Sequence, residues 1–187
     1  MGSLIAACVV GALRPDAGTV GITAIDKRPV IGAVKVGRLG LYADVQTDRK
    51  NHGGNDKAVY AYAQEDADFW SAQLGRDLPP GWFGENLRVS GLDVTNARVG
   101  ERWRIGSPGG PASFVELEVT MPRSPCATFA RWVGGADQRG WVKRFGAEGR
   151  LGAYLRVIRT GPVCAGDEIE LLSAPADAPT ILEMFRA

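Results

Sequence analysis

The chain has 187 residues, which predicts a single domain that can bury a core without disulfides or a structural metal. The hydrophobic fraction of 45% and the charged fraction of 23% are those of an ordinary globular protein. The net charge of +1 argues against a polyanion-binding surface, so no nucleic-acid partner is expected.

Short β-like stretches dominate the chain. The first one lies in the apolar run from Leu4 to Leu13, which is too short to span a bilayer, so no membrane partner is expected either. The clearest alternation is in 113–120, where Val115, Leu117 and Val119 would share one face. The predicted strands are 4–10, 19–25, 30–36, 41–46, 57–62, 86–90, 98–105, 113–120, 153–159 and 167–172.

Helices are few and short. The stretch 64–75 carries acids in its first turn and ends at Gly75, and it would place Ala67, Trp70 and Leu74 on one face. Two short helices are expected at 125–133 and 137–146, and a last turn near the C-terminus would be capped by Thr180. Short strands, dispersed glycines and few helices predict a mainly β barrel or sandwich.

The three cysteines cannot all pair, and they show neither a CxxC motif nor a zinc-binding spacing with histidine. This pattern predicts a reduced, cytoplasmic compartment. Cys8, inside the first apolar run, reads as a small buried hydrophobic residue, and Cys164 as an incidental residue of a Gly- and Pro-rich turn.

The third cysteine, Cys126, lies in "TMPRSPCATFARW" (120–132). If a helix begins here, Ser124 would be its N-cap, Pro125 would occupy the first helical position and Cys126 the second. The positive end of the helix and two nearby arginines, Arg123 and Arg131, would then stabilise a thiolate. A thiolate can serve as a nucleophile or as a ligand for a soft metal. The alternative is a buried cysteine at a strand-to-helix corner.

Two further groups of residues are candidates for ligand binding. The stretch "DRKNHGGNDKAVYAY" (48–62) contains the only histidine, His52, followed by Gly53, Gly54 and Lys57. Its glycines and lysine could present N–H groups and positive charge to a phosphate, or they could form a simple solvated turn.

The other group combines "DKRPV" (26–30) with "WFGENLRVSG" (82–91). Lys27 and Arg28 place two cations on an extended segment before a proline, and Asn86 opens a strand where its amide could hold a ring edge or a phosphate. Each feature alone is also typical of a solvated surface.

Together these segments resemble the MOSC domain, the family named from the C-terminal part of molybdenum cofactor sulfurase. The likeness is closest to the bacterial stand-alone branch of the YiiM type, and it runs from about residue 18 to 173, with 174–187 as a tail in a single domain over 1–187. The segments that carry it, in the family's order and spacing, are "DKRPV", "VQTDRKNHGGNDKAVYAYAQEDADFW", "LPPGWFGENLRVSGL", "VGERWRIG", "LEVTMPRSPCATFARWV" and "GRLGAYLRVIRTGPVCAGDEIEL".

The resemblance implies a mainly antiparallel β-barrel that binds the molybdenum cofactor, and no pyridoxal phosphate is expected. In this family the cysteine at the position of Cys126 is the protein ligand of molybdenum, and it has also been proposed to carry a persulfide. The expected activity is the reduction of N-hydroxylated compounds, including hydroxylaminopurines, with electrons from a separate reductase. His52 would donate a proton during N–O cleavage or shape its loop. The residues expected to hold the cofactor are Lys27, Arg28, Gly53, Gly54, Lys57, Asn86, Arg123 and Ser124.

The chain departs from the family pattern in two places. It stops at Ala187, where YiiM-type chains usually continue into a small helical extension, and Gly84 replaces an arginine that grips the cofactor in relatives. Two other functions remain open: a non-redox sulfur or cofactor carrier that uses Cys126, and a hydrolase with Cys126 as nucleophile and His52 as base.

Overall fold

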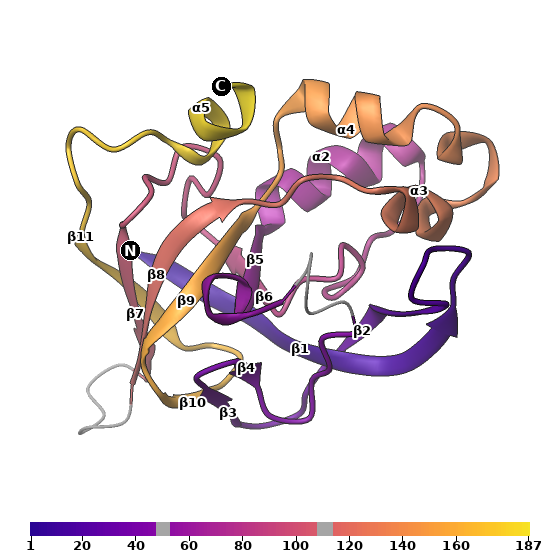
Figure 1. Cartoon of the computed structure of the whole chain (residues 1–187). Helices are drawn as coiled ribbons and strands as arrows, with labels where there is room; N and C mark the ends of the chain where they lie inside the picture. The colour runs from indigo at the N-terminus through magenta and orange to yellow at the C-terminus, as the bar shows by residue number, and fades with distance from the viewer. Residues whose placement is uncertain (48–52, 108–113) are drawn as a thin grey trace.

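The centre of the protein is a closed β-barrel (Figure 1). The computed structural model describes residues 1–47, 53–107 and 114–187. Within them the strand order is β11-β7-β8-β9-β5-β6-β1, and pairing of β1 with β11 closes the barrel. Only the β5–β6 pair of this barrel is parallel. The strands are β1 (Gly2–Pro15), β5 (Val59–Ala63), β6 (Leu87–Ser90), β7 (Arg102–Gly106), β8 (Val115–Pro122), β9 (Ala153–Arg159) and β11 (Glu168–Ser173). The predicted mainly β fold is therefore confirmed.

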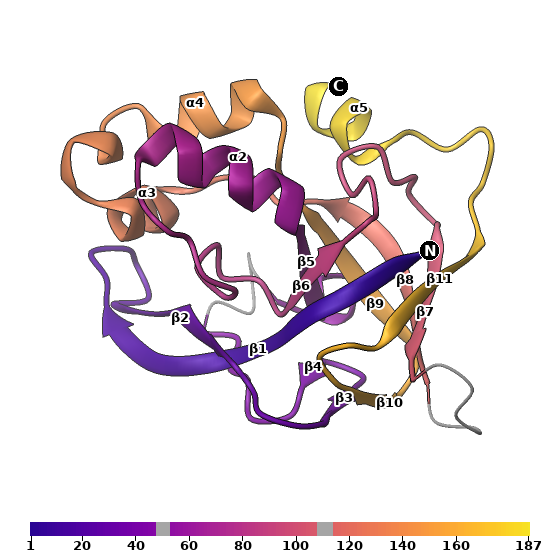
Figure 2. The ribbon, with the colours of Figure 1, turned by 180° about the vertical axis from the view of Figure 1, so that it is seen from behind.

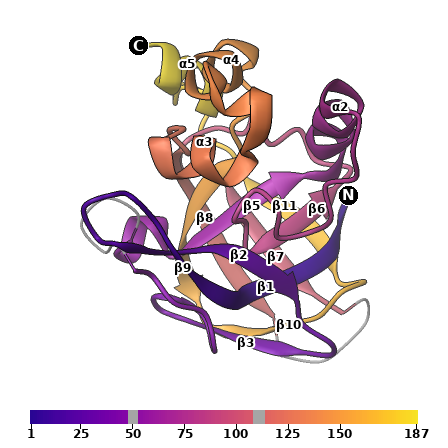
Figure 3. The ribbon, with the colours of Figure 1, turned by 90° about the vertical axis from the view of Figure 1, so that its right-hand side faces the viewer.

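The first strand serves two structures. Its N-terminal half, up to Ala7, pairs with β6 and β11 inside the barrel. From Cys8 onward it pairs with β2 (Ile22–Pro29) and leaves the barrel as a two-stranded ribbon (Figure 3). A separate small sheet with the order β10-β3-β4 packs nearby. Its strands are β3 (Val34–Gly37), β4 (Gly40–Leu41) and β10 (Gly161–Val163).

Aliphatic side chains fill the barrel. Val115, Leu117 and Val119 of β8 are fully buried, which confirms the alternation predicted for this strand. Strand β5 is buried throughout because both of its faces are covered. Its Val59 belongs to the core of the barrel, whereas Tyr60 belongs to a second, aromatic core outside it.

The aromatic core lies between the barrel wall and three helices (Figure 2). These helices are α2 (Gln64–Leu74), α3 (Ala127–Val133) and α4 (Trp141–Glu148). The last helix of the chain is α5 (Ile181–Arg186), and two short 3-10 helices are η1 (Asn55–Lys57) and η2 (Gly135–Gln138). The ring of Tyr62 stacks on Phe83 with 4.1 Å between centroids, and Trp70 lies 4.8 Å from Trp141. Burial of such rings contributes several kcal/mol, about 1.5–3 for each large apolar side chain.

The predicted end of α2 and the predicted cap of α5 are confirmed. Gly75 ends α2 in the left-handed conformation, and Ala67 and Trp70 of that helix are fully buried. Thr180 caps α5 in a capping box with Glu183, and Ile181 packs into the barrel core. No described helix is long and apolar enough to cross a membrane.

Several predicted elements were misplaced; the strands expected at 30–36 and 98–105, for example, begin only at Val34 and Arg102. The strand expected at 41–46 is limited to Gly40–Leu41, because Ala43 adopts a positive φ of 68° and ends the pairing. The strand expected at 19–25 begins at Ile22, because backbone hydrogen bonds among Asp16, Gly18 and Gly21 close a turn before it. The helix expected at 137–146 is split into η2 and α4, with Gly140 in the left-handed conformation between them.

Candidate functional site

A cavity of about 730 Å³ opens where the β1–β2 ribbon faces α3 and the end of β8. Of the residues predicted to form a site, Lys27, Lys57, Asn86, Arg123 and Cys126 line this one cavity. Segments that are distant in the sequence therefore meet at one place, as a binding site requires.

The remaining predicted residues lie elsewhere or outside the described part. Arg28 is exposed and pairs with Asp26 at 3.1 Å, away from the cavity lining. Gly54 was predicted to present its N–H to the cofactor, but this N–H donates to the side chain of Gln46 at 3.2 Å. Gly53 and Ser124 do not line the cavity. His52 lies outside the described residues, so its predicted role stays a prediction.

Cys126 is half-buried against the aromatic core, directly before α3. The predicted cap was wrong: Cys126 itself is the N-cap, with extended backbone at φ −131°, and Ser124 is an exposed residue outside the helix. The helix begins at Ala127, after the extended Cys126, and it buries Phe129 and Val133 in the aromatic core. A proline is favoured at a first helical position but does not impose one.

Arg123 is the most unusual charged residue of the cavity. It is 6% exposed, and its Nη1 has no hydrogen-bond partner among the described residues. The guanidinium stacks 3.9 Å from the centre of the Phe129 ring, with Tyr60 at 5.4 Å. A buried N–H without a partner costs free energy, so this guanidinium beside the cavity has an unused hydrogen-bond donor.

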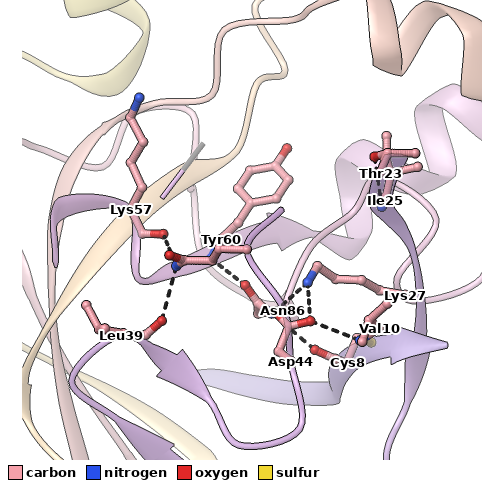
Figure 4. Close-up of polar contacts among 11 residues, drawn as sticks. Cys8, Val10, Thr23, Ile25, Lys27, Leu39, Asp44, Lys57, Tyr60 and Asn86 are labelled. Atoms are coloured by element: carbon pink, nitrogen blue, oxygen red, sulfur yellow. Dashed lines mark hydrogen bonds and ion pairs between the residues drawn. The ribbon is translucent and has the colours of Figure 1, made fainter. Parts of the chain in front are cut away.

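A second cluster joins Lys27, Asp44 and Asn86 (Figure 4). The ammonium of Lys27 contacts both oxygens of Asp44, and the amide of Asn86 donates to Asp44 at 2.7 Å and to the carbonyl of Cys8 at 3.2 Å. The amide oxygen of Asn86 accepts from the N–H of Tyr60 at 3.1 Å. Both amide hydrogens of Asn86 are thus used, so this side chain braces the cavity wall.

Gln46 supports the neighbouring loop in a similar way. Its Nε2 donates to the carbonyls of Leu39, at 3.1 Å, and Lys57, at 3.3 Å. The ammonium of Lys57 lies 5.8 Å from the centre of the Tyr154 ring, which also lines the cavity. The lysine predicted to contact a phosphate is therefore carried by a braced segment.

The charges that line the cavity do not balance. Among its described lining residues, four are cationic and two are carboxylates. The cations are Lys27, Lys57, Arg123 and Arg131, and the carboxylates are Asp16 and Asp44. The excess of positive charge, together with one thiol, suits an anionic ligand with affinity for sulfur.

Sequence reasoning did not single out Asp16, Asp44, Gln46, Tyr60 or Tyr154. Asp44 and Gln46 fell in a segment predicted as a strand, where alternation offers no hint of a buried ion pair. Tyr60 and Tyr154 looked like ordinary strand residues. Burial dominates the pKa of both phenols and raises it, so they stay neutral hydrogen-bonding groups near the cavity.

Comparison with known proteins identifies this arrangement. The family model described as the MOSC domain matches residues 48–170. The chain belongs to the MOSC domain family. The implied cofactor is compatible with the residues present, since the cavity joins Cys126, surplus positive charge and the unpartnered Nη1 of Arg123.

The chain is also similar to individual curated proteins. The MOSC chain is 38% identical over 151 residues to the uncharacterized protein YflK of Bacillus subtilis (strain 168), covering 81% of this chain and 64% of that protein. It is 30% identical over 174 residues to a protein of Gibberella moniliformis (strain M3125 / FGSC 7600) named "Reductase", covering 88% of this chain and 28% of that protein. The chain thus spans less than two thirds of these curated relatives.

A solved structure shares the fold. The crystal structure of YiiM from Geobacillus stearothermophilus superposes with a TM-score of 0.76 at 26% identity, covering 100% of this chain and 83% of that one. The likeness to the stand-alone YiiM-like branch, predicted from motifs, is confirmed.

Proposed function

We propose that this MOSC protein is a molybdenum-cofactor-binding oxidoreductase that reduces N-hydroxylated compounds, such as hydroxylaminopurines. Cys126 is the protein ligand of molybdenum, and a separate reductase supplies the electrons. Membership of the MOSC family and a relative named "Reductase" support this class of reaction. We place the reaction in the cytoplasm, where thiols stay reduced.

One observation carries the proposal: the buried Nη1 of Arg123 lacks a partner in the same cavity that Cys126 lines. A guanidinium with an open N–H can bind a phosphate or another oxyanion through charge-assisted hydrogen bonds. Lys57, which also lines the cavity, would add a second positive charge. Asn86 and Gln46 would hold the surrounding wall rather than contact the ligand, because their amides bond to the protein.

When bound, the molybdenum centre would supply two-electron chemistry. A single thiolate suits a metal whose other ligands are the dithiolene sulfurs of its cofactor. The tyrosines beside Arg123 hold their protons, since burial raises the pKa of Tyr60 and Tyr154. The hydroxyl of Tyr60 donates to the carbonyl of Leu151 at 2.7 Å, which fixes its ring against the guanidinium.

The test is metal analysis of protein made in cells that build the cofactor. The wild type is expected to contain molybdenum in amounts equal to the protein, and Cys126→Ser to lose most of it. Cys164→Ser is the matched control, because Cys164 is also half-buried but lies outside the cavity lining. Unchanged molybdenum in Cys126→Ser would refute the ligand assignment.

A second measurement separates the two functions that use this cysteine. The oxidoreductase requires that the metal-loaded protein consume an N-hydroxylated base with an artificial reductant. Metal binding without turnover, together with an extra sulfur atom on Cys126 in the mass spectrum, would instead indicate the carrier.

A further inference from the structure

The turn of the β1–β2 ribbon is bonded to α3 through a single carboxylate. Asp16 accepts hydrogen bonds from Nε and Nη2 of Arg131, at 2.8 and 2.7 Å. It also accepts from the hydroxyl of Thr128 at 2.9 Å and from the N–H of Gly18 in its own turn at 3.0 Å. The carboxylate is 8% exposed, so these bonds are largely shielded from water.

These contacts act on the helix that follows Cys126. No side chain of its own caps α3, and its N-cap is Cys126 itself. Thr128 and Arg131 lie in the first turn and the middle of this short helix, and both bond to Asp16. Asp16 therefore fastens the start of α3 from a different part of the chain, more than a hundred residues away in sequence.

The same turn forms one wall of the cavity. Gly18, Thr19 and Val20 line it together with Cys126, and the turn lies directly beneath α3 in both views (Figures 1 and 2). A side chain at Gly18 would collide with the Asp16 carboxylate at 2.7 Å and crowd Arg131 at 3.3 Å. At Gly18 the turn is therefore packed closely against side chains of α3.

We propose that Asp16 is a positioning residue: by holding Thr128 and Arg131, it fixes the wall of the cavity relative to the sulfur of Cys126 and thereby limits access to that sulfur. The inference depends on the proposed function in one respect only, namely that Cys126 is the functional residue of the cavity. It concerns the protein before any cofactor binds, so it can be tested even if no molybdenum is found.

Asp26 provides a matched control on the same ribbon. It is 2% exposed and accepts hydrogen bonds from Arg14 at 2.6 Å and from Arg28 at 3.1 Å. Both partners belong to β1 and β2, so Asp26 ties the ribbon to itself, whereas Asp16 ties the ribbon to the helix. Loss of either carboxylate weakens the ribbon, but only loss of Asp16 releases the wall from α3.

The experiment measures the rate at which iodoacetamide alkylates Cys126 in metal-free protein, resolved by peptide mass spectrometry with Cys164 as an internal reference. Asp16→Ala is expected to raise the rate about tenfold, the order that follows from loss of a charge-assisted contact. Asp26→Ala is expected to stay within about twofold of the wild type, because its bonds do not reach α3.

Two further variants keep the inference testable if Asp16→Ala folds poorly. Asp16→Asn retains an oxygen that accepts from Thr128, so a smaller rise of about threefold is expected. Asp16→Ala should raise the rate less in an Arg131→Ala background than in the wild type, since part of the contact that it removes is already lost there. An unchanged rate in Asp16→Asn and Asp16→Ala, or an equal rise in Asp26→Ala, would overturn the proposal.

Discussion

Two buried arginines of this protein should differ widely in how much stability they lose on the same substitution. Arg88 is fully buried and donates to Glu85, to Gln64 and to two backbone carbonyls. Arg123 is 6% exposed, yet its Nη1 has no partner among the described residues. Methionine has a comparable length and no charge, so it tests the value of each guanidinium in its place.

The magnitudes follow from the contacts. Arg88→Met leaves the buried charge of Glu85 without its partner, which costs about 3–5 kcal/mol of the free energy of unfolding. Arg123→Met loses the stacking on Phe129, worth about 0.5–2 kcal/mol, but it also removes an unpartnered buried N–H that costs about 1–3 kcal/mol. These two effects nearly cancel, so Arg123→Met should change the stability by no more than about 1 kcal/mol.

Urea denaturation of the metal-free variants, read as the midpoint at constant m, measures both changes. Arg123→Met is expected to keep the midpoint of the wild type while its molybdenum content falls, whereas Arg88→Met unfolds at much lower urea. A loss of stability in Arg123→Met as large as that in Arg88→Met would refute the reasoning, because it would show that Arg123 serves the fold rather than a ligand.

Three further results are expected. Asn86→Ala should lower the free energy of unfolding by about 2–4 kcal/mol, because the buried N–H of Tyr60 and carbonyl of Cys8 lose their hydrogen-bond partner. Asn96→Ala, at an exposed site, should change the free energy of unfolding by less than about 0.5 kcal/mol in the same urea titration. Burial raises the pKa of the Cys8 thiol from 9.0 to about 12, so the wild type should lose stability as the pH rises above 9, and Cys8→Ala should lose less; equal losses would contradict the assignment. The bond from Arg131 lowers the pKa of Asp16 from 3.8 to about 2, so the stability advantage of the wild type over Asp16→Asn should be complete above pH 4 and vanish as the pH falls through 2; an advantage that persists at still lower pH would show that this carboxylate does not cause it.

Local sequence signals account for much of the fold. The alternation in β8, the glycine that ends α2 and the threonine that caps α5 each act within a few residues, so they could be recognised without tertiary information. The strand predicted at 41–46 stops at Leu41 because Ala43 takes a positive φ, and Asp44 beyond it bonds to Lys27, 17 positions away in sequence. Burial and pairing with distant residues override local preference at such places.

The site was predicted less completely than the fold. Cys126, Arg123 and Lys57 could be singled out because a thiol or a cation within a glycine- and proline-rich setting is chemically conspicuous. Asp16 could not, because its significance arises from Arg131, 115 positions later. Asn86 was predicted to bind the ligand, but its amide bonds to three other segments of the protein. These contacts are distant in sequence, so the bracing role could not be recognised from the residues around Asn86.

Strand β1 pairs first within the barrel and then with β2, and this arrangement affects which parts of the protein tolerate sequence changes. The first half of β1 closes the barrel, whereas its second half carries the ribbon whose turn, from Asp16 onward, lines the cavity. Insertions or substitutions beyond Cys8, including the turn at Asp16, can therefore reshape the entrance of the site while the barrel keeps its register. Changes in the sequence of the β1–β2 hairpin, by evolution or by design, can therefore alter which molecules enter the cavity without changing the strand pairing of the barrel.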